Sequence, residues 1–76
     1  MTTVELDQLR VSYKKAADEW VNAIRAEEAL AGPDNSMVAM ERWDAAHYAE
    51  QDAHTKVTAA RDAYYKDGLR TVNYGI

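Results

Sequence analysis

Cysteine and phenylalanine are absent from the sequence, and its 76 residues include only one proline and three glycines. Without cysteine, disulfide bonds, thiolate metal sites and cysteine nucleophiles are excluded. The net charge of -4 lacks the basic excess that is typical of nucleic-acid-binding proteins. No apolar run approaches the roughly 20 residues of a membrane-spanning helix, and the first residues lack a signal-peptide pattern. We therefore expect a protein that contacts neither nucleic acid nor membranes directly.

Alanine, by contrast, occurs 14 times, and 47% of the residues are apolar. An alanine-rich chain with few helix breakers is typical of long helices. The length allows a single domain over residues 1–76. The sequence predicts an all-α hairpin of two long antiparallel helices, about 3–31 and 36–67, joined by a loop over 32–36 and followed by a short tail over 68–76.

Local signals set the ends of the first helix. Thr2 and Glu5 have the spacing of a capping box, in which the threonine oxygen accepts a hydrogen bond from a backbone amide of the first turn. At the other end, Gly32 is expected to adopt the left-handed conformation that ends many helices, and Pro33 cannot continue the helix.

The second helix is expected to begin after Asn35 or Ser36, both good N-cap residues, and to stop at Gly68. The remaining residues are β-prone and alternate at period two, which is compatible with a short strand, a docked extended tail or a frayed end. The apolar residues of this tail are Val72, Tyr74 and Ile76.

Apolar residues of the first helix recur at spacings of three and four, the a/d pattern of a heptad. This stripe comprises Leu6, Leu9, Tyr13, Ala16, Trp20, Ala23, Glu27 and Leu30, and Ala17, Ile24 and Ala31 widen it. The second helix has a small edge, formed by Ala39, Ala46, Ala53 and Ala60. Beside it runs a large, semi-polar edge of Met40, Trp43, His47, Glu50, His54, Val57, Arg61 and Tyr64.

A single helix pair has one line of contact, which cannot enclose so many large side chains. Domains of this size usually need a staple or oligomerisation, and no cysteine supplies a staple. The sequence therefore predicts a homodimer of hairpins, a four-helix bundle; the alternative is a monomer closed by the tail. The expected core and dimer residues are Leu6, Leu9, Tyr13, Trp20, Ile24, Leu30 and Val57.

Three side chains that can bind metal share one face of the second helix, namely His47, Glu50 and His54. Antiparallel pairing is expected to place Glu50 opposite residues 16–17 and His47 near Trp20, so that the first helix adds no ligand. We therefore predict no metal ion and no other cofactor, and interpret both histidines as structural interface residues.

Glu27 interrupts the apolar stripe of the first helix. We expect it to be partly solvated near the loop or paired with Arg42 of the facing helix. A single carboxylate without a partner motif is weak evidence for acid–base catalysis. No nucleophile with a base and no glycine-rich phosphate loop is present, so an enzyme is not predicted.

The two ends of the chain suggest a family. Residues 3–10 read Thr-Val-Glu-Leu-Asp-Gln-Leu-Arg, and residues 65–76 read Tyr-Lys-Asp-Gly-Leu-Arg-Thr-Val-Asn-Tyr-Gly-Ile. Over its whole length this small acidic hairpin resembles proteins of temperate bacteriophages, and more narrowly the phage quorum-sensing anti-activator family. The resemblance implies a dimer made early in infection in the bacterial cytoplasm, which binds a host transcriptional activator of the LuxR type and blocks its DNA binding.

No functional residue carries over from the family one by one, so the partner surface is predicted from the chain itself. Exposed aromatic and apolar side chains supply contact area at low entropic cost. The expected partner-binding residues are Trp43, His47, Tyr64, Tyr65, Val72, Tyr74 and Ile76. The alternatives are an inhibitor of another host system, such as CRISPR or pilus machinery, and a structural or assembly subunit.

Overall fold

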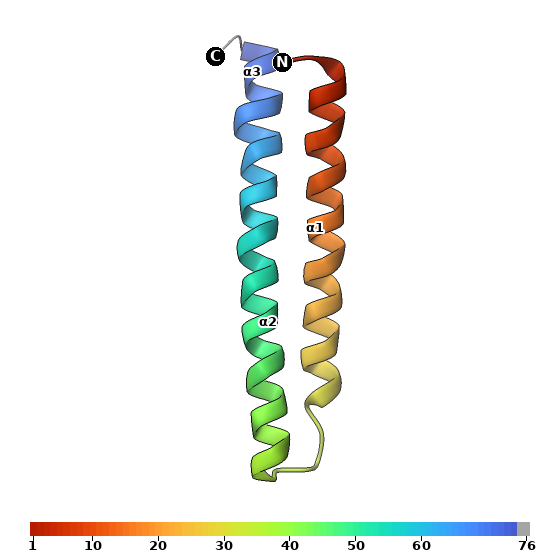
Figure 1. Ribbon diagram of the computed structural model, residues 1–76, viewed down its shortest axis with the longest axis vertical. Coiled ribbons are helices and arrows are strands. Elements are labelled where there is room, and N and C mark those ends of the chain that lie inside the picture. The colour runs from red at the N-terminus through yellow and green to blue at the C-terminus, as the bar shows by residue number, and fades with distance from the viewer. Residues whose placement is uncertain (75–76) are drawn as a thin grey trace.

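The structure is a computed structural model that describes residues 1–74. Helix α1 (Thr3–Leu30) is followed by α2 (Met37–Asp62), the π-helical segment η1 (Ala63–Leu69) and α3 (Arg70–Tyr74). α1 lies antiparallel to the continuous return arm of α2, η1 and α3 (Figure 1). The molecule is a rod of 55 × 16 × 12 Å, two helices wide and one helix thick. The predicted all-α hairpin is confirmed.

Two predicted helix starts are confirmed by their caps. The Thr2 hydroxyl accepts a hydrogen bond from the amide of Glu5 at 3.1 Å. The Ser36 hydroxyl accepts one from the amide of Ala39 at 3.2 Å, and the Asp34 carboxylate accepts from the amide of Ser36 at 3.0 Å. Each cap satisfies an amide that has no partner within its own helix.

The end of α1 differs from the prediction. Ala31 leaves the helix in an extended conformation, with φ −76° and ψ 97°, while its amide still donates to the carbonyl of Glu28. Gly32 does not have a positive φ, so the predicted left-handed glycine is wrong. The physical reason is that Pro33 restricts Gly32, the residue before it, to extended backbone, so that Gly32 does not form a left-handed turn.

The register of the two helices also differs from the expected one. His47 contacts Glu27, and Trp20 contacts Glu50. The expectations that His47 lies near Trp20 and that Glu50 lies opposite residues 16–17 are therefore wrong. Each residue of the return arm lies opposite a part of α1 about one to two turns closer to its C-terminus than expected.

The connecting segment, residues 31–36, causes this shift. It continues beyond the end of α1 before it turns, so that the first turns of α2 extend past α1 (Figure 1). A loop that closes at once would instead have placed the ends of the two helices level. Because of the shift, residues after Asp67 are needed to cover the start of α1.

Gly68 is the residue of the return arm that lies directly against the start of α1. The prediction that this glycine ends the second helix is wrong. It is buried, and a Cβ at this position would lie 2.9 Å from Cδ1 of Leu6 and 3.3 Å from Cδ1 of Leu9. Glycine is used here because it lets the two helices approach closely, while the backbone remains helical to Tyr74.

The π-helical segment explains how Gly68 comes to face α1. Val57, Ala60 and Tyr64 lie on the covered face at spacings of three and then four, and strict alternation of the two spacings would place Asp67 next. A π-helical turn adds one residue to the repeat. As a result Asp67 is exposed and Gly68 is buried.

The tail predicted over 68–76 is thus helical as far as Tyr74, not a strand or an extended segment. Val72 and Tyr74 are exposed, and α3 makes no close contact with α1. The prediction for Ile76 lies outside the described residues.

The apolar core is thin. Within residues 1–74, Val57 is the one buried apolar side chain, at 7% exposure. The rings of Tyr13 and Tyr64 stack with centroids 6.2 Å apart. Of the predicted core residues, Leu6, Leu9, Tyr13 and Trp20 are half-buried, whereas Ile24 and Leu30 are exposed in the single hairpin. In this part of the chain neither long helix is apolar over enough residues to cross a membrane.

Candidate functional site

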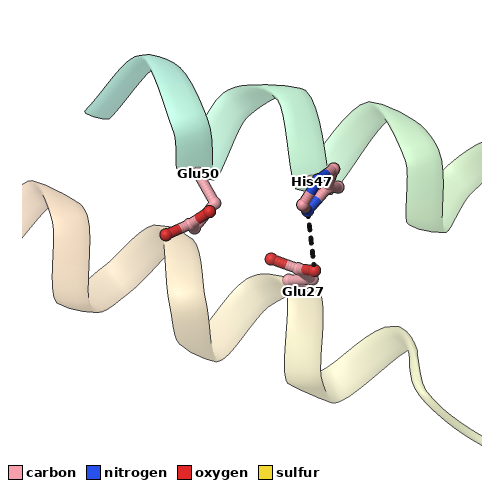
Figure 2. A group of neighbouring side chains, drawn as sticks. All are labelled: Glu27, His47 and Glu50. Carbon is pink, nitrogen blue, oxygen red and sulfur yellow. Dashed lines mark hydrogen bonds and ion pairs between the residues drawn. The ribbon is translucent and has the colours of Figure 1, made fainter. Parts of the chain in front are cut away.

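A polar cluster interrupts the contact between the two helices on the loop side of the rod. α1 contributes Glu27, and α2 contributes His47 and Glu50, which lie three residues apart and therefore on one face. Figure 2 shows the three side chains facing a common space between the helices. One nitrogen or oxygen atom from each lies within 4.8 Å of the others, and all three residues are half-buried. They are the residues that could hold a metal ion.

His47 is oriented by partners on both ring nitrogens. Nδ1 donates a hydrogen bond to Oε1 of Glu27 at 3.2 Å, because a carboxylate can only accept. The side-chain amide nitrogen of Gln51 lies 3.0 Å from Nε2, within hydrogen-bond distance. The ring of Trp43 stacks on that of His47 with centroids 5.3 Å apart and an angle of 5° between the planes. The imidazole therefore has one defined orientation.

Glu50 is oriented from the opposite side. The indole Nε1 of Trp20 donates a hydrogen bond of 2.7 Å to its Oε1. The same Trp20 ring lies 5.0 Å from that of His54, which is exposed and does not belong to the cluster. Trp20 thus links the apolar side of α1 to the polar cluster.

Two sequence-based assignments change as a result. The expected grouping of His47 and Glu50 with His54 is wrong, because Glu27 supplies the third group. Of the two alternatives expected for Glu27, pairing with Arg42 is wrong, because Glu27 pairs with His47; its side chain is 19% exposed and therefore still partly solvated. Sequence reasoning missed this because the register was misjudged. The available signal was the single acidic residue in the apolar stripe of α1.

The predicted partner-binding residues do not form one patch. Trp43 and His47 belong to the part of α2 next to the loop, whereas the other described members, Tyr64, Tyr65, Val72 and Tyr74, belong to η1 and α3 at the opposite end of the rod (Figure 1). Tyr64 is half-buried against Tyr13, whereas Tyr65 is exposed. The remaining members of the described set, Val72 and Tyr74, are exposed on α3.

A second surface feature lies next to the cluster. Leu30, Met40 and Trp43 line a shallow hollow at the loop end, and Ile24 and Trp43 line the adjoining hollow that contains the polar cluster. We call these four residues the loop-end apolar surface. Each is between 37% and 53% exposed.

Comparison with protein-family models, with curated proteins and with solved structures finds no match for this chain. The class of protein is therefore defined by its own features. It is a two-helix hairpin with a thin core, a Glu–His–Glu cluster between the helices and an adjoining apolar surface.

Proposed function

We propose that the protein is a non-enzymatic protein–protein interaction module that pairs with a second copy into a four-helix bundle. The observation that carries the proposal is the exposed area. The hairpin exposes 5768 Å². A compact monomer of 8.6 kDa exposes about 4,700 Å². The excess of about 1,100 Å² exceeds the roughly 800 Å² that each partner contributes to a standard interface.

Much of this surface is apolar. Large apolar side chains on both long helices are exposed, while Val57 alone is buried within residues 1–74. A contiguous apolar surface on a protein this small is typical of an interface. The loop-end apolar surface is contiguous, because Trp43 lines both of its hollows. A second copy that covers it would complete the core that one hairpin lacks.

The oligomeric state tests this step. Light scattering is expected to give twice the chain mass for the wild type at micromolar concentration. Met40→Glu places a charge in the loop-end apolar surface and is expected to give monomers. Val11→Glu, on an exposed valine outside that surface, is the matched control and is expected to remain dimeric. A monomeric wild type, or a dimer disrupted only by the Val11 change, contradicts the proposal.

The finer proposal concerns the target. We infer from the family resemblance that the bundle is a bacteriophage inhibitor that binds a host LuxR-type transcriptional activator and keeps it from DNA. The net charge of -4 supports a target other than DNA. Exposed Val72 and Tyr74, on a helix that does not pack against α1, leave apolar contact area for a partner.

A mobility-shift assay tests the finer proposal. A purified LuxR-type activator is mixed with its operator DNA and increasing amounts of this protein. The activator–DNA complex is expected to disappear, and this protein alone is expected to leave the DNA unshifted. An unchanged activator–DNA complex contradicts the choice of target, and a shift caused by this protein alone contradicts the inhibitor reading.

A further inference from the structure

We propose that Glu27, His47 and Glu50 form a binding site for one divalent transition-metal ion of the zinc class, held between α1 and α2. The site is independent of the proposed interaction with a host protein. It also departs from the expectation of no metal, which was based on a different set of three side chains.

The geometry of the cluster is close to that of a bound ion. Zinc lies about 2.0 Å from imidazole nitrogen and carboxylate oxygen, so two ligand atoms of a tetrahedron are about 3.3 Å apart. Nδ1 of His47 and Oε1 of Glu27 are 3.2 Å apart, which is already one edge of such a tetrahedron. One Glu50 oxygen lies within 4.8 Å of the ligand atoms of the other two residues, so the Glu50 side chain has to turn toward them to complete the site.

The ligands are also oriented from outside, as in known metal sites. A metal-binding histidine usually donates its second N–H to a neighbouring group, and carboxylate ligands accept further hydrogen bonds. The side-chain amide of Gln51 is already within hydrogen-bond distance of Nε2 of His47, and the indole N–H of Trp20 already donates to Glu50. When the metal binds Nδ1, the imidazole proton moves to Nε2, and the Gln51 amide turns its oxygen toward it.

The negative charges of the two carboxylates also favour a bound cation. The two carboxylates face each other between the helices, and like charges at this distance repel. In residues 1–74 no lysine or arginine forms an ion pair with either of them. A divalent cation between them would replace this repulsion with attraction to both helices.

The donor set indicates the class of metal. Imidazole suits zinc, iron, nickel and copper, whereas magnesium and calcium prefer sites made only of oxygen. Three protein ligands leave a fourth position of the tetrahedron for a water molecule. We therefore expect Zn²⁺ and Co²⁺ to bind and Mg²⁺ not to bind.

Titration calorimetry of the full chain with ZnCl₂ tests the proposal, with Co²⁺ absorption as a second readout. One ion per chain is expected, together with a rise in melting temperature, because a ligand that binds only the folded state stabilises it. His47→Gln and Glu27→Gln are expected to weaken binding by more than about 100-fold, and Gln51→Ala by about tenfold.

Matched controls separate the site from general surface binding. His54→Gln and Glu28→Gln change the same residue types close by, but outside the cluster, and are expected to bind zinc as the wild type does. Circular dichroism checks that every variant is folded. The proposal is overturned if the wild type does not bind zinc, if His54→Gln abolishes binding, or if folded His47→Gln binds as tightly as the wild type.

Discussion

The half of the hairpin that carries the chain termini joins its two arms mainly by apolar contacts, whereas the half next to the loop joins them by polar contacts. In the terminal half, Gly68 brings the return arm against Leu6 and Leu9, and Val57 is buried. In the loop half, Glu27 and Glu50 occupy the facing positions instead of apolar side chains. The terminal half thus contributes apolar contacts that stabilise the hairpin. In the loop half, the same two helices place polar side chains next to one another.

Polar groups are tolerated in the loop half because they are paired. Glu27 accepts from His47, and Glu50 accepts from Trp20. A half-buried carboxylate without such a partner would destabilise the hairpin. The comparison therefore predicts that apolar packing matters most in the terminal half and hydrogen bonding matters most in the loop half.

The largest effect is expected from Val57→Asp. Val57 is the one apolar side chain buried within residues 1–74, and an unpaired carboxylate there should lower the free energy of unfolding by more than about 3 kcal/mol, enough to unfold a hairpin of this size. Circular dichroism should show loss of helix. Val38→Asp, at a position that is 56% exposed, is the control and should remain helical. A folded Val57→Asp variant would show that the core lies elsewhere.

Gly68→Val should lower the free energy of unfolding by about 1–3 kcal/mol, because the added carbons overlap Leu6 and Leu9. Gly32→Ala is the matched control. A Cβ at Gly32 meets no atom within 4 Å, so this change should not destabilise the protein. Urea denaturation measures both variants. Equal stability of the two would mean that the helices do not approach closely at Gly68.

Trp20→Phe tests the loop half. This substitution keeps an aromatic ring but removes the N–H that donates to Glu50. We expect the free energy of unfolding, measured by denaturation, to fall by about 1–2 kcal/mol. Trp43→Phe removes an indole that stacks on the ring of His47. It should lower the free energy of unfolding by less than Trp20→Phe does. The opposite order would show that the hydrogen bond does not stabilise the cluster.

The smallest effect on stability is expected from deletion of residues 70–76. α3 makes no close contact with α1, so thermal melts should change little and helical content should fall only by the deleted turns. If α3 contributes the partner surface, the deletion should weaken inhibition in the mobility-shift assay. Unfolding of the shortened chain would instead assign α3 a structural role.

Local chemistry explains why much of the fold could be predicted. The caps at Thr2 and Ser36 depend on residues at most three positions away, so sequence spacing suffices to identify them. The stripe of α1 from Leu6 to Trp20 was likewise visible as a repeat of three and four, and it faces the return arm. These features depend on helix periodicity, which is a property of the backbone.

The site could not be predicted in the same way. It depends on which residue of α2 lies opposite Glu27, and this is decided by the path of residues 31–36 and by the fit of Gly68 against Leu6. The small and large edges of α2 recur along the helix, so they are compatible with pairings of α1 and α2 that differ by one helical turn.

By itself, then, the sequence determined the two helices, their N-terminal caps and the face that α1 presents, because these follow from interactions within a few residues. Only the tertiary structure decided the register, the π-helical turn that makes Gly68 face α1, and the meeting of Glu27 with His47 and Glu50. The physical reason is that these features depend on close packing between residues 20 or more positions apart, which local spacing does not specify.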